Sequence, residues 1–197
     1  MKIFKYDVRF KTLFKRGVKS YKDDFFVGLI TGYQGSGKNV LANMLIDEVN
    51  KKIVYTNVHS LCLPNKEFIY FTKLDDIYKY DDDKSIFLID ELGKKFPKES
   101  KQDARFYGWL QQSRKHNRHV YMIHQEYIQV PTWLRGVANK VYTTRKLFGS
   151  IFCSSLGIPI LNNDTKEWET DNFLYIIYKR TKKYTNCYDT FERINEL

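Results

Sequence analysis

The chain has 197 residues, enough for one α/β domain with a hydrophobic core. Apolar residues make up 43% and aromatic residues 16% of it, which excludes an intrinsically disordered protein. The formal net charge of +10 indicates a polyanionic partner, either nucleic acid or anionic lipid. No apolar run approaches the ~18 residues that a membrane span needs, and the first residues lack the apolar core of a secretory signal. We therefore expect a cytoplasmic protein with no transmembrane segment of its own.

Basic residues are concentrated at the start of the chain. Residues 1–22 contain eight Lys or Arg against one acid, Asp7, so we expect a basic N-terminal arm over 1–24. Two further basic stretches are RKHNRH at 114–119 and KRTKK at 179–183. Each is either a solvated surface or a contact for DNA phosphates. Such contacts would be independent of base sequence and sensitive to salt.

Short apolar runs alternate with segments of helical periodicity from residue 25 onward. The apolar runs predict buried strands at 25–32, 52–57, 68–72, 85–91 and 119–125. Apolar residues at helical spacing predict helices over 38–50 and 101–117. Strands that alternate with helices predict an α/β fold, with a mostly parallel sheet covered by helices on both faces. Ligands of such a sheet gather at the carboxyl ends of its strands.

After Pro131 the pattern changes to strands that follow one another without helices. We expect strands at 139–148 and 149–155, and a pair formed by 173–180 and 182–191. The predicted organisation is a core over 25–150 and a β-rich C-terminal extension over 151–197, packed on the same domain.

The segment GYQGSGK at 32–38 has the spacing of a phosphate-binding loop, or P-loop, and lies between a predicted strand and a predicted helix, as that motif requires. Its glycines allow backbone N–H groups to turn toward phosphates, the helix N-terminus adds partial positive charge, and the lysine reaches the β and γ oxygens. The predicted nucleotide contacts are Gly32, Tyr33, Gln34, Gly35, Ser36, Gly37, Lys38, Asn39 and Val40.

Polar residues end two of the strands predicted after the P-loop, the one at 85–91 and the one at 119–125. Asp90 is suited to hold Mg²⁺ directly or through water, because a hard cation needs carboxylate oxygen near the phosphates. Glu91 is the candidate that polarises the attacking water. Gln125 ends the following strand, where a side-chain amide can bind both the γ-phosphate and that water. Two exposed acids at a strand end would be the simpler interpretation, but their pairing with a P-loop favours the nucleotide site.

Asn39 stands where a P-loop normally has Ser or Thr, whose hydroxyl is a ligand of Mg²⁺. Its amide carbonyl is also a neutral oxygen, carried on an arm one atom longer, and such oxygens are acceptable ligands of hard cations. Two outcomes stay open: Asn39 keeps the metal and hydrolysis survives, or the chain binds nucleotide with little turnover. The intact Lys38, Asp90, Glu91 and Gln125 favour the first.

Four segments, in order and spacing, resemble the ATPase domain of zonular occludens toxin-like proteins, which are filamentous-phage morphogenesis ATPases. They are GLITGYQGSGKN (28–39), KIVYTNVHSL (52–61), FLIDELGKKFP (87–97) and LQQSRKHNRHVYMIHQEYIQVPTWLRGVANKVY (110–142). That family is similar in turn to the FtsK–HerA superfamily of DNA-pumping motors, which includes packaging ATPases of membrane-containing viruses. The resemblance covers about residues 25–145 and leaves out the basic arm and the β-rich extension.

The resemblance implies a P-loop sheet of the additional-strand type, in ring-forming subunits that hydrolyse ATP while moving DNA. By position it assigns Lys38 to phosphate, Asp90 to Mg²⁺, Glu91 to catalysis and Gln125 to sensing. Toxin-like members usually carry a membrane span after the ATPase domain. Because this chain shows none, we expect a packaging motor and not a machine that extrudes a filament through a membrane.

A motor of this kind often needs an arginine from the neighbouring subunit to stabilise charge on the transferring phosphate. Head-to-tail packing in a closed ring supplies that geometry. The first candidate is Arg118, and the weaker ones are Arg114 and Arg135. The partners expected are DNA, further copies of the chain in a ring, and capsid or membrane-associated assembly proteins. Docking would place the motor on a virion vertex or at the inner membrane.

Three functions are compatible with these residues. The favoured one is an oligomeric ATPase that translocates viral DNA during particle assembly. A small-molecule kinase also has a P-loop, but usually an arginine-rich lid in place of the Asp90–Glu91 pair followed by a strand that ends in Gln125. The third is a nucleotide-gated adaptor at a virion vertex or membrane, in which Asn39 has reduced turnover.

Overall fold

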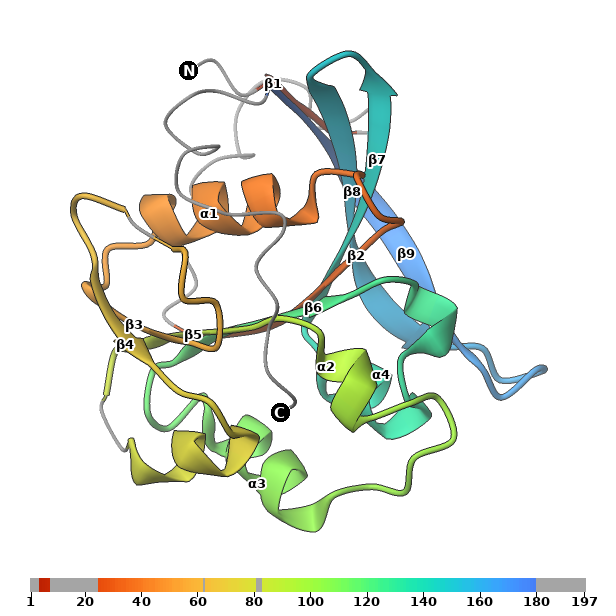
Figure 1. The fold of residues 1–197 in the computed structure, drawn as a ribbon. Helices are drawn as coiled ribbons and strands as arrows, with labels where there is room; N and C mark the ends of the chain where they lie inside the picture. The colour runs from red at the N-terminus through yellow and green to blue at the C-terminus, as the bar shows by residue number, and fades with distance from the viewer. Residues whose placement is uncertain (1–3, 8–24, 62, 81–82, 180–197) are drawn as a thin grey trace.

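In a computed structural model, which describes residues 4–7 and 25–179 except 62, 81 and 82, the described strands form one mixed sheet (Figure 1). The strand order is β1-β9-β8-β7-β2-β6-β5-β3-β4. The elements, in chain order, are β1 (Phe4–Asp7), β2 (Phe26–Thr31), α1 (Lys38–Glu48), β3 (Ile53–Thr56), β4 (Glu67–Tyr70), η2 (Leu74–Lys79), β5 (Ile86–Ile89), α2 (Leu92–Lys95), α3 (Ala104–Gln112), β6 (His119–His124), η3 (Tyr127–Gln129), α4 (Thr132–Val137), β7 (Lys140–Phe148), β8 (Ile151–Leu161) and β9 (Trp168–Lys179).

The strands from β7 to β4 run parallel to one another, as predicted. β2, which leads into the P-loop, pairs with β7 on one side and β6 on the other. β6 in turn pairs with β5, so that one strand lies between the P-loop strand and the strand that leads to Asp90. This inserted strand is what distinguishes the additional-strand type of P-loop sheet, and the prediction is confirmed.

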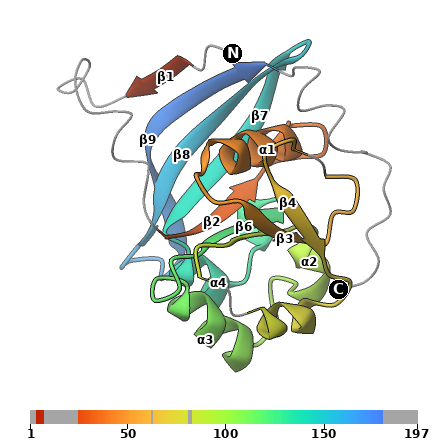
Figure 2. The same cartoon turned by 90° about the vertical axis from the view of Figure 1, so that its left-hand side faces the viewer.

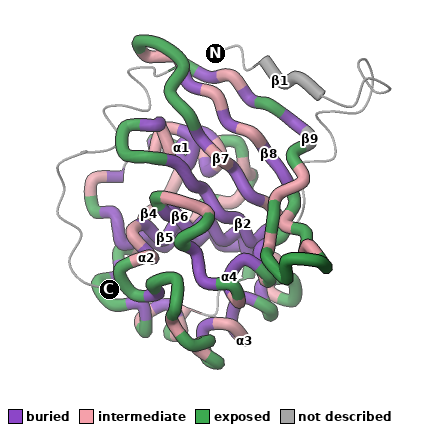
Figure 3. The backbone as a smooth tube through the Cα atoms, turned by 90° about the vertical axis from the view of Figure 1, so that its right-hand side faces the viewer, coloured by how far each residue is buried: buried purple, intermediate pink, exposed green. Residues whose placement is uncertain are grey.

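Helices cover both faces of the parallel strands, because alternate residues of each strand point to opposite sides. Phe26 and Ile30 of β2 pack in the core beneath α1, whereas Val27 and Leu29 pack in a second core on the other face. η2, α2, α3 and α4 supply that second core (Figure 1). Burial on both faces explains why these strands are continuous apolar runs in the sequence; Figure 3 shows the buried centre of the sheet.

The C-terminal strands continue the same sheet in antiparallel fashion. β7 pairs with β8, β8 with β9, and β9 with β1; Figure 2 shows β7, β8 and β9 side by side. Apolar residues of β8 and β9 join the core beneath α1: Phe152, Leu156, Leu174, Ile176 and Tyr178. The predicted partner of 173–180, at 182–191, lies outside the described residues, as does most of the basic arm.

The helix predicted over 101–117 is shorter in the structure, where α3 ends at Gln112. Asp103 starts the helix, because its side chain accepts a hydrogen bond from the backbone N–H of Phe106. A series of turns follows α3, and Asn117 takes a left-handed backbone conformation with φ 49°. None of the helices in the described part of the chain has the length and hydropathy needed to span a bilayer.

Candidate nucleotide-binding site

The P-loop connects β2 to α1 at the carboxyl edge of the parallel strands. Gly32, Gly35 and Gly37 all have positive φ angles, of 147°, 75° and 89°, which other residues rarely adopt. The N–H of Gly32 donates to the carbonyl of Gln125 at 2.8 Å, which ties the loop to the end of β6. α1 begins directly after Gly37, so its N-terminal N–H groups face the space enclosed by the loop.

Lys38 folds back over the loop. Its Nζ donates to the carbonyls of Gly32 at 2.6 Å and Tyr33 at 3.1 Å. Burial lowers the pKa of Lys38, and the nearby carboxylate of Asp90 opposes that shift. The lysine therefore lies within electrostatic reach of the acid that ends β5, and the two motifs that are far apart in the sequence form one site.

Hydrogen bonds to its backbone hold Asp90 in place. The Asn57 side chain donates to the carbonyl of Asp90 at 3.0 Å and accepts from its N–H at 2.9 Å. The carboxylate of Asp90 accepts from the N–H of Glu91 at 2.7 Å. Asn57 was missed by the sequence analysis, although it directly follows β3 and so belongs to the same edge. Its two bonds fix where the Asp90 carboxylate lies.

Glu91 occupies a strained backbone position. Its φ of 54° and ψ of 30° lie in the left-handed region, which costs a residue with a side chain about 1–3 kcal/mol. This conformation turns the chain sharply from β5 into α2. The carboxylate forms an ion pair with Lys94, and the Glu91 side chain is 39% exposed. Because such an exposed pair contributes at most about 1 kcal/mol, the Glu91 side chain can leave it at little cost.

Asn39 carries an unused acceptor. Its Oδ1 atom is shielded from solvent and has no hydrogen-bond partner among the described residues. A buried polar atom without a partner costs about 1–3 kcal/mol, so its presence needs an explanation. A cation held jointly by Asn39, Asp90, phosphates and water would supply one. The residues present therefore fit Mg²⁺.

His124 also lies at this edge of the sheet. It ends β6, between the strands that lead to the P-loop and to Asp90, and is 7% exposed. Neither ring nitrogen makes a hydrogen bond of normal geometry in the described part of the chain, although the Glu126 backbone is close enough to affect the ring. A Cβ added to Gly93 would lie 2.5 Å from its Nε2, so the ring sits directly against α2. Burial lowers the pKa of His124, the charge of Lys38 adds to that effect, and the backbone of Glu126 opposes it.

The remaining predicted contacts lie around the same loop. The Gln125 side chain is exposed, and it is its backbone carbonyl that holds Gly32. Tyr33 is 72% exposed at the tip of the loop. Gln34 and Gly35 are also exposed, Ser36 is buried, and Val40 is half-buried.

Arg135 was predicted as a candidate arginine that acts on the nucleotide of a neighbouring subunit, but in the structure it holds parts of its own chain together. It lies in α4 and is 6% exposed. Its guanidinium donates to the carbonyls of Val130 at 2.8 Å, Ile128 at 3.4 Å and Trp168 at 3.5 Å. These bonds connect α4 to the preceding turn and to β9. A guanidinium engaged in this way is not presented to a neighbouring subunit.

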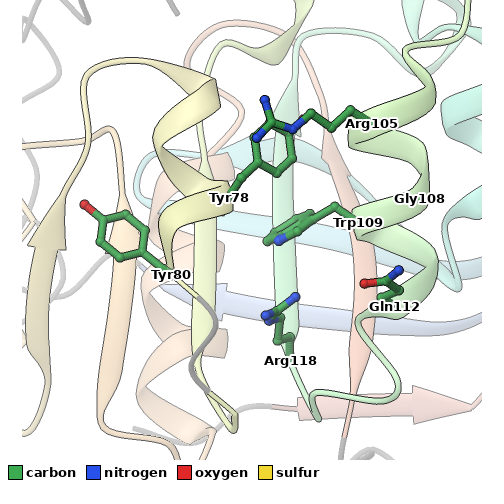
Figure 4. Close-up of a pocket in the computed structure, with 7 residues that line it drawn as sticks. All are labelled: Tyr78, Tyr80, Arg105, Gly108, Trp109, Gln112 and Arg118. Atoms are coloured by element: carbon green, nitrogen blue, oxygen red, sulfur yellow. The ribbon is translucent and has the colours of Figure 1, made fainter.

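Arg118 is also buried, with only 1% of its surface exposed, which speaks against its predicted role in trans. It immediately precedes β6, at the opposite end of the parallel strands from the P-loop. Its guanidinium carbon lies 5.4 Å from the ring centre of Trp109 and 5.9 Å from that of Phe87. Figure 4 shows it among the side chains that line a pocket of about 390 Å³. The other lining residues are Tyr78, Tyr80, Arg105, Gly108, Trp109 and Gln112.

The basic stretch at 114–119 is partly exposed and partly buried. Arg114 and Lys115 are exposed, whereas Arg118 and His119 are buried. The other two basic stretches lie almost entirely outside the described residues. Arg114 is thus the arginine candidate that remains accessible.

We predict that Arg135→Met destabilises the fold by about 1–3 kcal/mol, because buried carbonyls lose their donors. Chemical denaturation measures this change. The exposed Arg114→Met is the control and should change the free energy of unfolding by less than about 0.5 kcal/mol. An Arg135→Met protein of unchanged stability whose ATP turnover alone is lost would contradict the structural role and restore the role in trans.

Comparisons with known proteins identify the fold and the family of the chain. No curated protein sequence matches the chain. Among solved structures, the N-terminal domain of zonular occludens toxin from Neisseria meningitidis matches with a TM-score of 0.60 and 22% identity, over 84% of this chain and 99% of that one. The genome packaging NTPase B204 from Sulfolobus turreted icosahedral virus 2, in complex with AMPPCP, matches with a TM-score of 0.50 and 11% identity, over 75% and 97%. At these identities the two structures show a shared P-loop NTPase fold. The family model described as zonular occludens toxin (Zot) matches residues 26–154, more than half of the chain, which therefore belongs to the Zot family.

Proposed function

We propose that this protein hydrolyses ATP and uses the energy to translocate or package viral DNA during particle assembly. The observation that carries the proposal is the convergence of the P-loop, Asp90, Glu91 and His124 on one edge of the sheet. Two of the residues at that edge, Asn39 and His124, have buried polar atoms without partners among the described residues. A bound nucleotide and its metal would supply those partners.

The triphosphate would lie in the P-loop, with its oxygens facing the loop N–H groups and the start of α1. Lys38 would exchange its two carbonyl acceptors on the loop for β and γ oxygens of the nucleotide. That exchange replaces hydrogen bonds from a cationic donor to neutral carbonyls by hydrogen bonds to anionic phosphate oxygens, in which both partners are charged. Tyr33, exposed at the tip of the loop, is free to contact the nucleoside.

Asn39 and Asp90 would hold Mg²⁺, which neutralises phosphate charge when bound. Asn57 keeps the Asp90 backbone in place for this role. Glu91 would leave Lys94 and accept the proton of the attacking water. His124, which its lowered pKa keeps neutral near pH 7, would donate one hydrogen bond to the γ-phosphate. Gln125 remains a candidate for the same phosphate and for the water, since its exposed side chain can turn toward them.

Three observations support the DNA motor over other ATPases. The formal charge of +10 suits a phosphate backbone. The chain belongs to the Zot family, and it shares its fold with an NTPase described as packaging a viral genome. We further propose that subunits form a ring, that an exposed arginine such as Arg114 acts on the neighbouring nucleotide, and that capsid or membrane-associated proteins dock the ring on a virion vertex or at the inner membrane of the host.

One observation favours a second function, that of a nucleotide-gated adaptor. Asn39 replaces the hydroxyl that normally binds Mg²⁺, and a longer, more mobile ligand could leave ATP bound without turnover. The two functions differ in product formation, which can be measured directly.

We predict that the protein hydrolyses ATP with Mg²⁺, that DNA stimulates the reaction, and that Glu91→Gln lowers kcat by about 10²–10⁴-fold. Gln keeps the size of the side chain but cannot accept the proton, so ATP binding should persist. Phosphate release measures turnover, and a fluorescent ATP analogue measures binding. Glu99→Gln, at an exposed position outside the site, is the control.

Tight ATP binding without phosphate release, even on DNA, would favour the adaptor. Phosphate transfer to nucleosides would instead indicate a kinase. A monomer whose turnover is indifferent to DNA would overturn the motor.

We predict that Asn39→Ala raises the Mg²⁺ concentration for half-maximal ATPase activity by about tenfold, on the order of 1.4 kcal/mol, because one metal ligand is lost. Asn39→Ser should restore a hydroxyl ligand and keep Mg²⁺ dependence near that of the parent protein. Asn50→Ala, exposed just beyond α1, is the control. An unchanged Mg²⁺ requirement in Asn39→Ala would remove Asn39 from the metal site.

We predict that His124→Ala lowers kcat by about 10²-fold while ATP affinity changes little, because the bond to the γ-phosphate strengthens as charge develops. Gly93→Ala should act in the same direction, since the new Cβ displaces the His124 ring. Steady-state kinetics on both variants and on Gln125→Ala would rank the two strand-end residues. If Gln125→Ala abolished ATP turnover while His124→Ala kept normal turnover, the sensing role would belong to Gln125.

A further inference from the structure

Three neighbouring antiparallel strands each place one buried side chain against the P-loop. Thr144 comes from β7, Phe152 from β8 and Tyr178 from β9, and none is more than 5% exposed. We call these three residues the loop wall. The nucleotide-binding role of the P-loop does not by itself explain them, because they come from strands outside the loop and the helix that follows it.

Thr144 holds the first half of the loop. Its Oγ1 donates to the carbonyl of Thr31 at 3.0 Å, where β2 ends. The same atom lies 2.7 Å from the Oγ of Ser36, which is then the donor of that hydrogen bond. A Cβ on Gly32 would lie 2.3 Å from Thr144 Oγ1, so the loop passes against this hydroxyl as closely as glycine allows.

Phe152 and Tyr178 hold the second half. They are directly opposite each other across β8 and β9, and their rings stack at 5.6 Å. A Cβ on Gly37 would lie 2.7 Å from the Phe152 ring, so that ring supports the loop beneath Gly37. The Tyr178 hydroxyl donates to the carbonyl of Gly37 at 3.2 Å. That carbonyl also accepts the N–H of Leu41 in the first turn of α1.

We propose that Thr144 and Tyr178 are positioning residues, which hold the glycine-rich loop in its phosphate-binding shape and thereby set the affinity for the nucleotide. The inference rests on the proposed binding of ATP at this loop. A loop with three glycines has many accessible conformations when it is unconstrained. Bonds that restrict it before the ligand arrives reduce the entropy lost on binding, so removing them should weaken binding.

The position of Tyr178 extends this role beyond the part of the chain that the family model matches, which ends at residue 154. β9 is the strand on which β1 pairs, at the edge of the sheet farthest from β4. A change in the packing of β9 would therefore reach Gly37 through a single side chain.

The test compares Thr144→Val and Tyr178→Phe, each of which removes one hydroxyl with little change of shape. We expect each to weaken binding of a fluorescent ATP analogue about 3- to 10-fold. Competition by tripolyphosphate should weaken to the same extent, because the parts of the loop that Thr144 and Tyr178 hold would contact the phosphates and not the nucleoside. Thr144→Ser, which keeps the hydroxyl, should restore affinity. Tyr175→Phe, the same chemical change at a 39% exposed position of β9, is the matched control and should bind like the parent protein.

The outcomes separate this inference from the proposed function. A parent protein that binds no ATP analogue would overturn the proposed function itself. A parent protein that binds, with Thr144→Val and Tyr178→Phe within twofold of it, would overturn only the positioning role. An equal loss in Tyr175→Phe would overturn it too, since the effect would not depend on contact with the loop. Tyr178→Phe alone decides the question should Thr144→Val fail to fold.

Discussion

The insertion of β6 between β2 and β5 is the constraint on which the candidate site depends. Parallel pairing brings the ends of these strands level, with Thr31 opposite His124 and Ile89 opposite Met122. The P-loop, the Asp90–Glu91 pair and His124 must then emerge at one edge, although Gly32 and His124 are 92 positions apart in the sequence. β2, β6 and β5 are each paired on both sides and buried on both faces, so this edge has little freedom to change.

At that edge the fold tolerates features that would be unfavourable elsewhere. Glu91 has a left-handed backbone, and Asn39 and His124 have buried polar atoms without partners in the described part of the chain. Each feature has an energetic cost of the order of 1 kcal/mol or more. The two cores that α1 and the helices of the other face form with the sheet stabilise the fold around these features. The cost at the site is consistent with polar groups that are held ready for a charged ligand.

The prediction of the fold from the sequence was accurate where local pattern and burial agree. The strands β2, β5 and β6 are continuous apolar runs because both of their faces are covered, and the P-loop is marked by glycines whose φ angles no other residue adopts easily. The helix predicted over 101–117 was too long. Its ends are set by single residues, the capping Asp103 and those of the turns before Asn117, which the apolar periodicity does not mark. The roles of Arg118 and Arg135 could not be inferred, because burial of an arginine depends on the elements that pack over it.

What the sequence determined by itself is the chemistry at the strand ends: a P-loop, an acid pair after an apolar strand, and membership of a family that shares them. Only the tertiary structure decided which side chains support that chemistry. Asn57 bonds Asp90 from 33 residues away, and Thr144 and Tyr178 bond the P-loop from 108 and 141 residues away. Contacts over such separations depend on strand order and register. The local sequence around each of these residues contains no pattern from which the contact could be predicted.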